Sequence, residues 1–252
     1  MAVGYLSLLV LLPLAALLSN AFTGGLGTFW NEVTQSESLA AIRLSVITAA
    51  LVVGANAVTG LLVAFVLVRD DFPGKGILNA VIDLPLALPT VVAGLTLLSL
   101  YGPASPIGLN IAFTPWAIVL ALAFVTLPFS VRSVQPVLSA FDPAEEETAA
   151  SLGAGPVAIF RRVLLPKLLP AMLAGAGLGF ARALGEYGSV VLISGNLPFR
   201  TELASVRIYG LVQSYDLPAA AAVALVLVVI ALAVLMGLAW VRHRADAARR
   251  YA

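Results

Sequence analysis

The chain has no cysteine and only one histidine, His243, among its 252 residues. Without cysteine it forms no disulfide and has no thiolate metal ligand and no thiol nucleophile. A single histidine in the C-terminal tail excludes a multi-histidine metal centre and a catalytic Ser-His-Asp triad. Charged residues are also scarce, at 11% of the chain against about 25% in soluble domains. The net charge of +1 offers no basic field for nucleic acid, so no nucleic-acid partner is expected.

A phosphate-binding loop of the G-x-x-x-x-G-K-[ST] type is missing. The nearest stretch, 72–76, lacks the upstream glycine, and Lys75 is followed by glycine instead of a hydroxyl residue. The glycines within 175–179 lie inside an apolar run, not between a strand and a helix, so they do not indicate a dinucleotide site. We therefore expect no enzymatic activity, no metal site and no cofactor. Any ATP that powers this protein would be bound and hydrolysed by another chain.

Apolar residues, in contrast, make up 61% of the chain. A helix needs about 20 of them to cross a bilayer core of about 30 Å. Six stretches qualify: 3–22, 44–68, 80–101, 111–131, 168–194 and 217–241. The third and fourth come from one uncharged stretch, 84–131, which the turn-forming run 102–106 divides. We therefore predict an all-α, polytopic membrane protein with six transmembrane helices in a single domain, 1–252.

The first stretch has a second interpretation, as a cleaved signal peptide with residues 19–21 as a weak processing site. Signal peptides carry a positively charged region ahead of their apolar core. No Lys or Arg precedes residue 3, so we expect a retained span.

Lys and Arg gather in alternate loops, and this bias predicts which side faces the cytoplasm. The loops assigned to the outer side hold only Arg200 and Arg207. The inner loops and the tail hold Arg69, Lys75, Arg132, Arg161, Arg162, Lys167, Arg242, Arg244, Arg249 and Arg250. We therefore expect both termini, and the long loop 132–167, on the cytoplasmic side.

The loop 132–167 contains the start and stop signals of a helix. Asp142 is placed as its N-cap, Pro143 as its first residue, and Glu145 as the residue that closes a capping box. The helix 143–152 then ends at Gly153.

A second short helix is predicted over 157–165, ending before Pro166. Arg161 and Arg162 lie off its apolar face. The residues alone leave two interpretations open. The two helices form an elbow that docks a partner protein, or they form a solvated loop whose arginine pair binds anionic lipid headgroups.

The run Glu-Thr-Ala-Ala-Ser-Leu-Gly at 147–153, followed by Val-Leu-Leu-Pro at 163–166, resembles the EAA loop of bacterial ABC importer permeases. Thr148 and Val163 replace the usual Ala and Ile, and both replacements are small or isosteric. In that family the loop is the coupling element, which sits in a groove of the ATP-binding subunit. The resemblance implies a coupling role for Glu147, Ala149, Leu152, Gly153, Arg161, Arg162 and Pro166.

Further runs, at 83–94, 124–129, 134–138, 181–190 and 193–196, are similar to sulfate/thiosulfate permeases of the CysT (CysU) type. The similarity covers about 40–240 and implies a MetI-like permease fold in the bacterial inner membrane. The implied partners are a CysA-like ATPase dimer, a second, CysW-like permease subunit, a periplasmic sulfate-binding protein and membrane lipid. Two alternatives remain: a molybdate-type ABC permease, which shares much of this pattern, and a self-sufficient ion-coupled transporter or channel.

Several polar and small residues fall inside the predicted spans. Arg182 and Glu186, four residues apart, either line the path of an anion or form a structural ion pair. The Asn56 side chain either forms a hydrogen bond between two helices or serves as a hydrogen-bond donor in the translocation path. The small residues of the fifth span allow close contact between helices. The candidate residues of the translocation path or subunit interface are Asn56, Pro85, Pro89, Gly175, Gly179, Arg182, Glu186 and Ser189.

The largest charged feature on the outer side is the loop 196–216. We place a candidate docking site for a substrate-delivering protein at Arg200, Glu202 and Arg207. The alternative is an amphipathic lid at the membrane surface. The sequence leaves open whether the permease partner is a second copy or a different chain.

Overall fold

The computed structural model describes the backbone of residues 2–250, without the side chains of residues 2, 3, 6, 243 and 245–250. The predicted tail residues His243, Arg249 and Arg250 thus lie outside the described side chains. All regular structure in the described part is helical, which confirms the all-α prediction. In chain order the elements are α1 (Ala2–Ala21), α2 (Gly25–Thr34), α3 (Ser36–Arg69), α4 (Lys75–Ala87), α5 (Thr90–Tyr101), α6 (Pro115–Ser139), α7 (Pro143–Ser151), α8 (Pro156–Ile159), η1 (Phe160–Leu164), α9 (Leu165–Leu184), α10 (Gly188–Ile193), α11 (Ala204–Gln213) and α12 (Leu217–Arg250).

Four helices of the described chain are long and apolar enough to cross a membrane. They are α3, α6, the run Pro156–Leu184 and the part of α12 up to Arg242. Two bent pairs bring the number to six if each pair is one crossing. One pair joins Ser7–Ala21 to α2 at 90°, and the other joins α4 to α5 at 115°. The number of predicted spans, six, is thus reached only if each bent pair crosses the membrane once.

The third predicted span, 80–101, is not one helix. α4 ends at Ala87 and α5 begins at Thr90, with 115° between them. Pro89 explains the break, because proline lacks an amide hydrogen and disfavours helical geometry at the residue before it. Leu88 accordingly has a ψ of 137°. Pro85, in contrast, lies buried inside α4.

The fifth predicted span, 168–194, is also divided. α9 ends at Leu184, and α10 begins only at Gly188. The residue after α9, Gly185, forms the C-cap, and its amide donates to the carbonyls of the last turn. The helical run extends further toward the N-terminus than predicted, because α8, η1 and α9 are continuous.

The predicted helix end before Pro166 is therefore wrong. η1 is a wide, π-type turn, in which the Leu165 amide donates to the Phe160 carbonyl five residues earlier. A wide turn of this kind accommodates a proline, because it removes the need for the amide hydrogen that proline lacks. The chain thus passes from α8 into α9 without a break.

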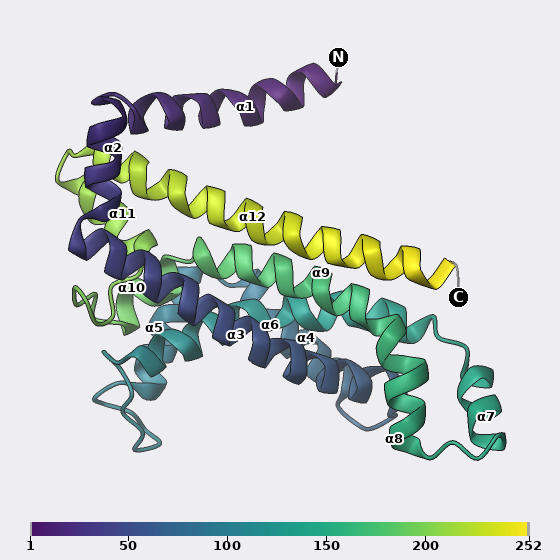
Figure 1. Cartoon of the computed structure of the whole chain (residues 1–252). Helices are drawn as coiled ribbons and strands as arrows, with labels where there is room; N and C mark the ends of the chain where they lie inside the picture. Colours follow the sequence, from purple (N-terminus) through teal and green to yellow (C-terminus); the bar gives the residue numbers. More distant parts are fainter. Residues whose placement is uncertain (1, 251–252) are drawn as a thin grey trace.

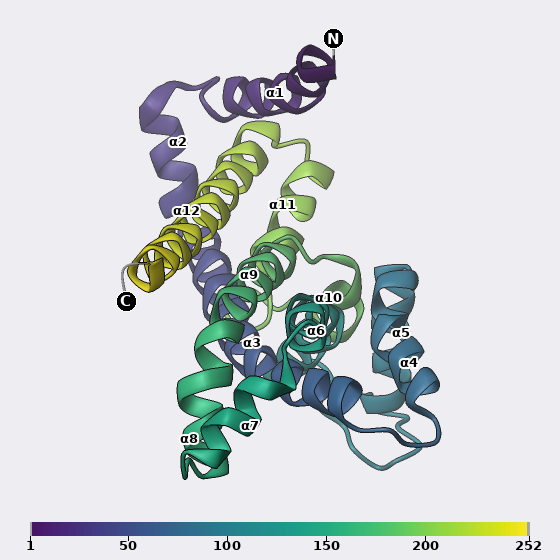
Figure 2. The ribbon, with the colours of Figure 1, turned by 90° about the vertical axis from the view of Figure 1, so that its right-hand side faces the viewer.

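α3, α6 and α9 pack against one another at the centre of the bundle (Figure 2). Gly175 of α9 lies against α6, where an added Cβ would be 2.9 Å from the Ser133 Cβ and 3.0 Å from the Phe129 carbonyl oxygen. α12 packs on α9, and α1 packs on α12 at the edge of the bundle (Figure 1).

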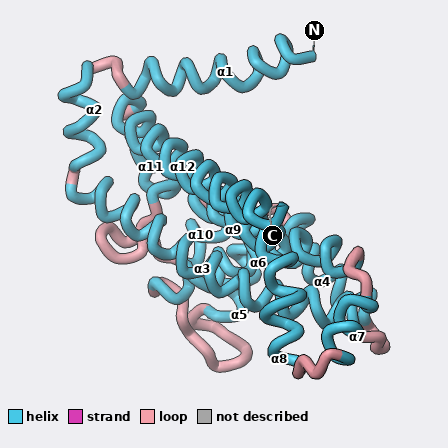
Figure 3. Tube along the Cα trace, turned by 45° about the vertical axis from the view of Figure 1, so that its right-hand side comes forward, coloured by secondary structure: helices cyan, strands magenta, loops and turns pink. Residues whose placement is uncertain are grey.

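The two ends of the bundle differ in character. α7 and α8 project beyond the long helices at one end, joined by the loops drawn in pink (Figure 3). α10, α11 and the loop that follows α5 lie at the opposite end (Figure 1). α3 and α12 run toward the α7 end while α1 runs away from it, so both ends of the described chain lie toward α7 and α8 (Figure 1).

Candidate functional site

α7 starts as the sequence predicts, with one difference. Asp142 is the N-cap, and its Oδ1 accepts a hydrogen bond of 3.0 Å from the Ala144 amide. Pro143 is the first helical residue. Glu145 does not close a capping box, because its carboxylate instead forms an ion pair with Lys167 at the start of α9. A full positive charge in reach is a stronger partner for a carboxylate than a backbone amide.

α7 ends in a Schellman motif centred on Gly153. The Gly153 amide donates to the Ala150 carbonyl at 2.9 Å, and the Ala154 amide donates to the Ala149 carbonyl at 3.1 Å. Gly153 has a φ of +85°, a left-handed conformation that glycine adopts without strain. Two of the positions that carry the EAA resemblance, Ala149 and Gly153, thus belong to the turn that stops the helix.

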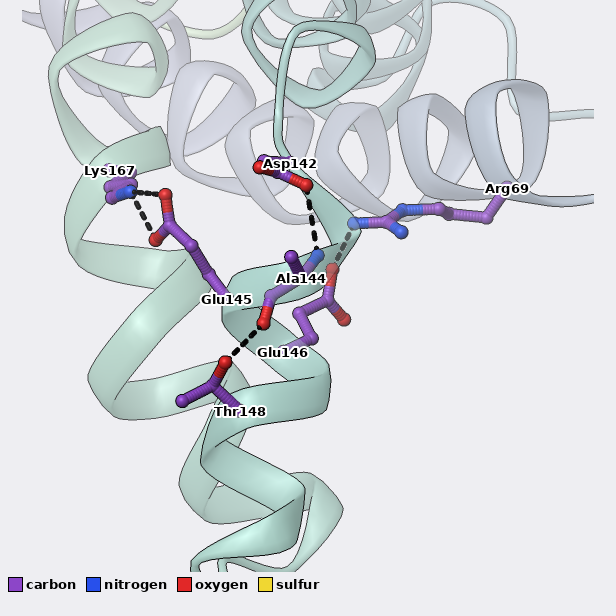
Figure 4. A network of polar contacts seen from close by, with 7 residues as sticks. All are labelled: Arg69, Asp142, Ala144, Glu145, Glu146, Thr148 and Lys167. Carbon is purple, nitrogen blue, oxygen red and sulfur yellow. Dashed lines mark hydrogen bonds and ion pairs between the residues drawn. The ribbon is translucent and has the colours of Figure 1, made fainter.

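The three consecutive glutamates of α7 have different surroundings, and Figure 4 shows the first two, Glu145 and Glu146. Glu146 forms an ion pair with Arg69, the last residue of α3. Glu145 pairs with Lys167 on the other side, and the Lys167 ammonium also lies 4.8 Å from the centre of the Phe141 ring. Glu147 is exposed and makes no ion pair among the described residues. Glu147 is therefore the glutamate that is available to a partner.

The end of the molecule that α7 and α8 form (Figure 3) also exposes apolar and basic side chains. Leu152 is 83% exposed and Val157 is 70% exposed, which is unusual for large apolar side chains in contact with water. Arg161 and Arg162 are exposed and, with Val157 and Ala158, line a surface depression. The predicted coupling residues Leu152, Arg161 and Arg162 therefore share one exposed end of the molecule.

The predicted pair Arg182 and Glu186 is present at the C-terminal end of α9. The Arg182 Nη1 lies 2.6 Å from the Glu186 Oε2, and the Glu186 side chain is only 1% exposed. The Glu186 Oε1 accepts a 2.8 Å hydrogen bond from the Ser189 amide, in the first turn of α10. This carboxylate therefore connects α9 to α10 and lies against the Arg182 charge as its counter-ion. The Ser189 hydroxyl is buried and has no hydrogen-bond partner among the described residues.

Asn56, Gly175 and Gly179 contact other helices of the same chain. The Asn56 Nδ2 donates to the Ala123 carbonyl at 3.0 Å and to the Thr126 hydroxyl at 2.9 Å, which joins α3 to α6. Gly175 lies against α6, and Gly179 lies against both α3 and α6. This face of α9 thus packs against helices of its own chain, and a second subunit would have to pack on another face.

A cluster around Arg132 was not expected from the sequence. The Arg132 guanidinium donates to both oxygens of Asp83, at 2.8 and 2.6 Å, and to the Asn79 side-chain and backbone oxygens, at 3.0 and 3.1 Å. It also donates to Gln135. The cluster joins α4 to α6, and the separation of Arg132 from Asp83 along the chain hides it from any local pattern.

The three outer docking candidates are not alike. Arg200 is exposed, whereas Arg207 of α11 forms an ion pair with Glu37 of α3. Glu202 is partly buried, and burial raises the pKa of its carboxyl above the ordinary value of 4.5, with a smaller opposing effect of Arg207. Only Arg200 presents its charge outward.

Within the described residues, no group of three His, Asp or Glu side chains could hold a metal ion.

Residues 56–245 match the family described as "Binding-protein-dependent transport system inner membrane component". The chain is 44% identical over 239 residues to a protein of Synechocystis named "Sulfate transport system permease protein CysT", covering 92% of this chain and 84% of the relative. Proteins of the same name from Salmonella typhimurium and Escherichia coli are 40% and 39% identical, each covering 95% of this chain and 89% of the relative.

Solved structures of transporters share the fold at low sequence identity. A bacterial ABC transporter involved in the import of alginate superposes with a TM-score of 0.79 at 17% identity, over 96% of this chain and 92% of that one. The MetNI methionine ABC transporter superposes with a TM-score of 0.64 at 18% identity, over 82% of this chain and 95% of that one. The chain is thus a multi-pass membrane protein with a MetI-like fold, and it belongs to the family of binding-protein-dependent transport system inner membrane components.

Proposed function

We propose that this chain is one of two membrane subunits of an ABC importer that carries sulfate or thiosulfate across the bacterial inner membrane. Its family membership and its identity to proteins named sulfate permeases support the substrate class. The observation that carries the proposal is α7, an acid-capped helix that projects from one end of the bundle with Glu147 and Leu152 exposed. A helix with this surface is suited to contact another protein.

The proposed complex contains a CysA-like ATPase dimer, a second, CysW-like permease subunit and a periplasmic sulfate-binding protein. One similar solved structure contains a periplasmic protein bound to its ABC transporter, which supports the type of partner. The chain itself is not an enzyme and carries no cofactor in this proposal, and the ATPase subunits bind the ATP. Both termini, α7 and α8 face the cytoplasm, and α11 faces outward.

In the proposed mechanism, the binding protein delivers the oxyanion to the outer face, near Arg200. ATP closes the ATPase dimer, and α7 passes that movement into the membrane helices. The cavity between the two permease subunits then changes from inward-open to outward-open. Arg182 offers only a weak, transient contact to the anion, because Glu186 already compensates its charge. Selectivity therefore lies largely in the binding protein.

Reconstitution of the complex in lipid vesicles tests this proposal. We expect sulfate uptake that requires ATP, the ATPase subunits and the binding protein together. Uptake driven by an ion gradient through this chain alone would identify a self-sufficient transporter instead. Stimulation of ATP hydrolysis by molybdate-loaded, but not sulfate-loaded, binding protein would identify a molybdate-type permease.

A further inference from the structure

We propose that Glu145 and Glu146 are positioning residues that connect α7 mechanically to α9 and α3, so that a partner moving α7 moves both helices. This inference rests on the proposed importer function and adds residues that the EAA resemblance does not contain. It also adds α3 to the route, whereas the elbow alone would suggest a route through the two neighbouring spans, α6 and α9.

The first observation is that apolar packing does not hold α7 in place. None of the α7 residues is buried, and its contacts with the bundle are made by Glu145 and Glu146 instead of large apolar side chains. A helix without a buried face has no fixed orientation from the hydrophobic effect. Its orientation must come from its two chain connections and from its polar contacts.

The second observation is where those polar contacts lead. Glu146 reaches Arg69 at the C-terminal end of α3, and Glu145 reaches Lys167 in the first turn of α9 (Figure 4). Consecutive residues of a helix point about 100° apart, so the two carboxylates contact different helices. α3 and α9 both pack on α6, so the two contacts enter the same central bundle.

The third observation concerns Glu147, which is rotated about 100° further around the same helix. It is exposed and has no ion-pair partner among the described residues. α7 thus turns two glutamates toward its own chain and one toward the outside. This division is what a transmitting element needs, because it must be attached to both the partner and the bundle.

Stability alone does not explain the two pairs. All four side chains are partly exposed, and pairs of this kind contribute only about 0–1 kcal/mol to folding. Their removal is therefore compatible with a folded and assembled complex. What the pairs provide is a definite position of α7 relative to α3 and α9.

Charge reversal in the complete reconstituted complex tests the inference, with sulfate import and ATP hydrolysis measured in parallel. The variants are Glu145→Lys, Lys167→Glu and the two combined, and Glu146→Arg, Arg69→Glu and the two combined. We expect each single reversal to lower the sulfate imported per ATP hydrolysed by about threefold or more, since attraction becomes repulsion. Each combined variant should restore most of the wild-type ratio, because the pair re-forms with exchanged charges.

Asp71→Lys is the matched control. Asp71 pairs with Lys75 at the same end of the molecule, but that pair does not involve α7. This variant should keep the wild-type ratio. If a reversal removes the ATPase subunits from the purified complex, the neutral variants Glu145→Gln and Glu146→Gln replace it. We expect them to lower the sulfate imported per ATP hydrolysed by a smaller factor, because they remove the attraction without adding repulsion.

Two results would overturn the inference: single variants with a wild-type ratio, or combined variants as uncoupled as the single ones. Neither result would affect the proposed function, which the wild-type complex tests in the same assay. A wild-type complex without ATP-dependent sulfate uptake would reject the proposed function and the inference together.

Discussion

At the scale of single residues, backbone geometry at Gly153 decides how α7 ends. Its φ of +85° is unfavourable for residues with a Cβ, and the space around its Cα is open. The requirement for glycine is therefore conformational and not steric. Gly155, two residues later, has a φ of −72° and equally open surroundings, so it has no such requirement.

We predict that Gly153→Val uncouples ATP hydrolysis from transport while the chain still inserts into the membrane. A β-branched residue in the left-handed region costs on the order of 1–2 kcal/mol, enough to unwind the end of an unburied helix. The ratio of sulfate imported to ATP hydrolysed measures the effect, and Gly155→Val is the control. Equal ratios for the two variants would show that the end of α7 is not important for coupling.

The raised pKa of Glu202 should make the stability of the protein depend on pH. Burial raises the pKa of its carboxyl above 4.5, so between 4.5 and the raised value the folded protein binds more protons than the unfolded chain. Stability therefore falls as the pH rises through this window. Glu202→Gln removes the effect, and the Tm of the variant should exceed that of the wild type at neutral pH. The difference should shrink as the pH approaches 4.5, and a difference independent of pH would contradict the prediction.

At the scale of elements, the link between α9 and α10 depends on the Glu186 carboxylate. It is almost fully buried and binds both Arg182 and the Ser189 amide. A buried carboxylate that loses its cation is strongly destabilising, whereas removal of both charges is often nearly neutral. The stabilities of the single variant that removes Arg182 and of the double variant that removes both charges therefore test whether the two residues form a structural pair.

We predict that Arg182→Ala lowers the free energy of unfolding by about 3 kcal/mol, the lower end of the usual range, because Arg182 is itself partly exposed. Combining it with Glu186→Gln should recover most of the loss, since the amide oxygen still accepts from Ser189. Thermal unfolding of the purified complex provides the measurement. If the double variant is stable but imports no sulfate, the pair belongs to the transport path.

The contact between α5 and α10 leaves no room for a side chain at Gly94. A Cβ added to Gly94 would lie 2.6 Å from the Ser189 carbonyl oxygen, and backbone cannot move aside as a flexible side chain can. We predict that Gly94→Ala destabilises the protein by about 1–3 kcal/mol through overpacking. Gly54→Ala, at an open position of α3, should be neutral or slightly stabilising. Equal Tm values for the two variants would contradict this packing.

At the scale of the whole molecule, the absence of cysteine makes the orientation directly testable. Glu147 and Arg200 are both exposed. Glu147 belongs to α7 and Arg200 to the loop between α10 and α11, and these elements lie at opposite ends of the bundle (Figure 1). We predict that an impermeant thiol reagent labels Arg200→Cys in intact spheroplasts, and labels Glu147→Cys only after the membrane is opened. The reverse pattern would place α7 outside and remove the basis for a coupling role.

The sequence by itself determined what depends on neighbours along the chain. Helix caps and turns involve residues within about five positions of each other, so Asp142, Pro143 and Gly153 predict α7 correctly. The apolar stretches predict the all-α class and a chain with several membrane-spanning helices. The spacing of the EAA run predicts the family, because it spans a short, continuous segment.

The tertiary structure decided which residues meet across the bundle. Arg132 finds Asp83, and Glu145 prefers Lys167 to its own helix end, because the fold brings distant charges within reach. The wide turn before Pro166 and the sharp bend at Pro89 also depend on packing, since proline marks a possible break without setting its angle. Interactions between residues close in the sequence determine where helices form, and only the packing of those helices determines which helix each side chain contacts.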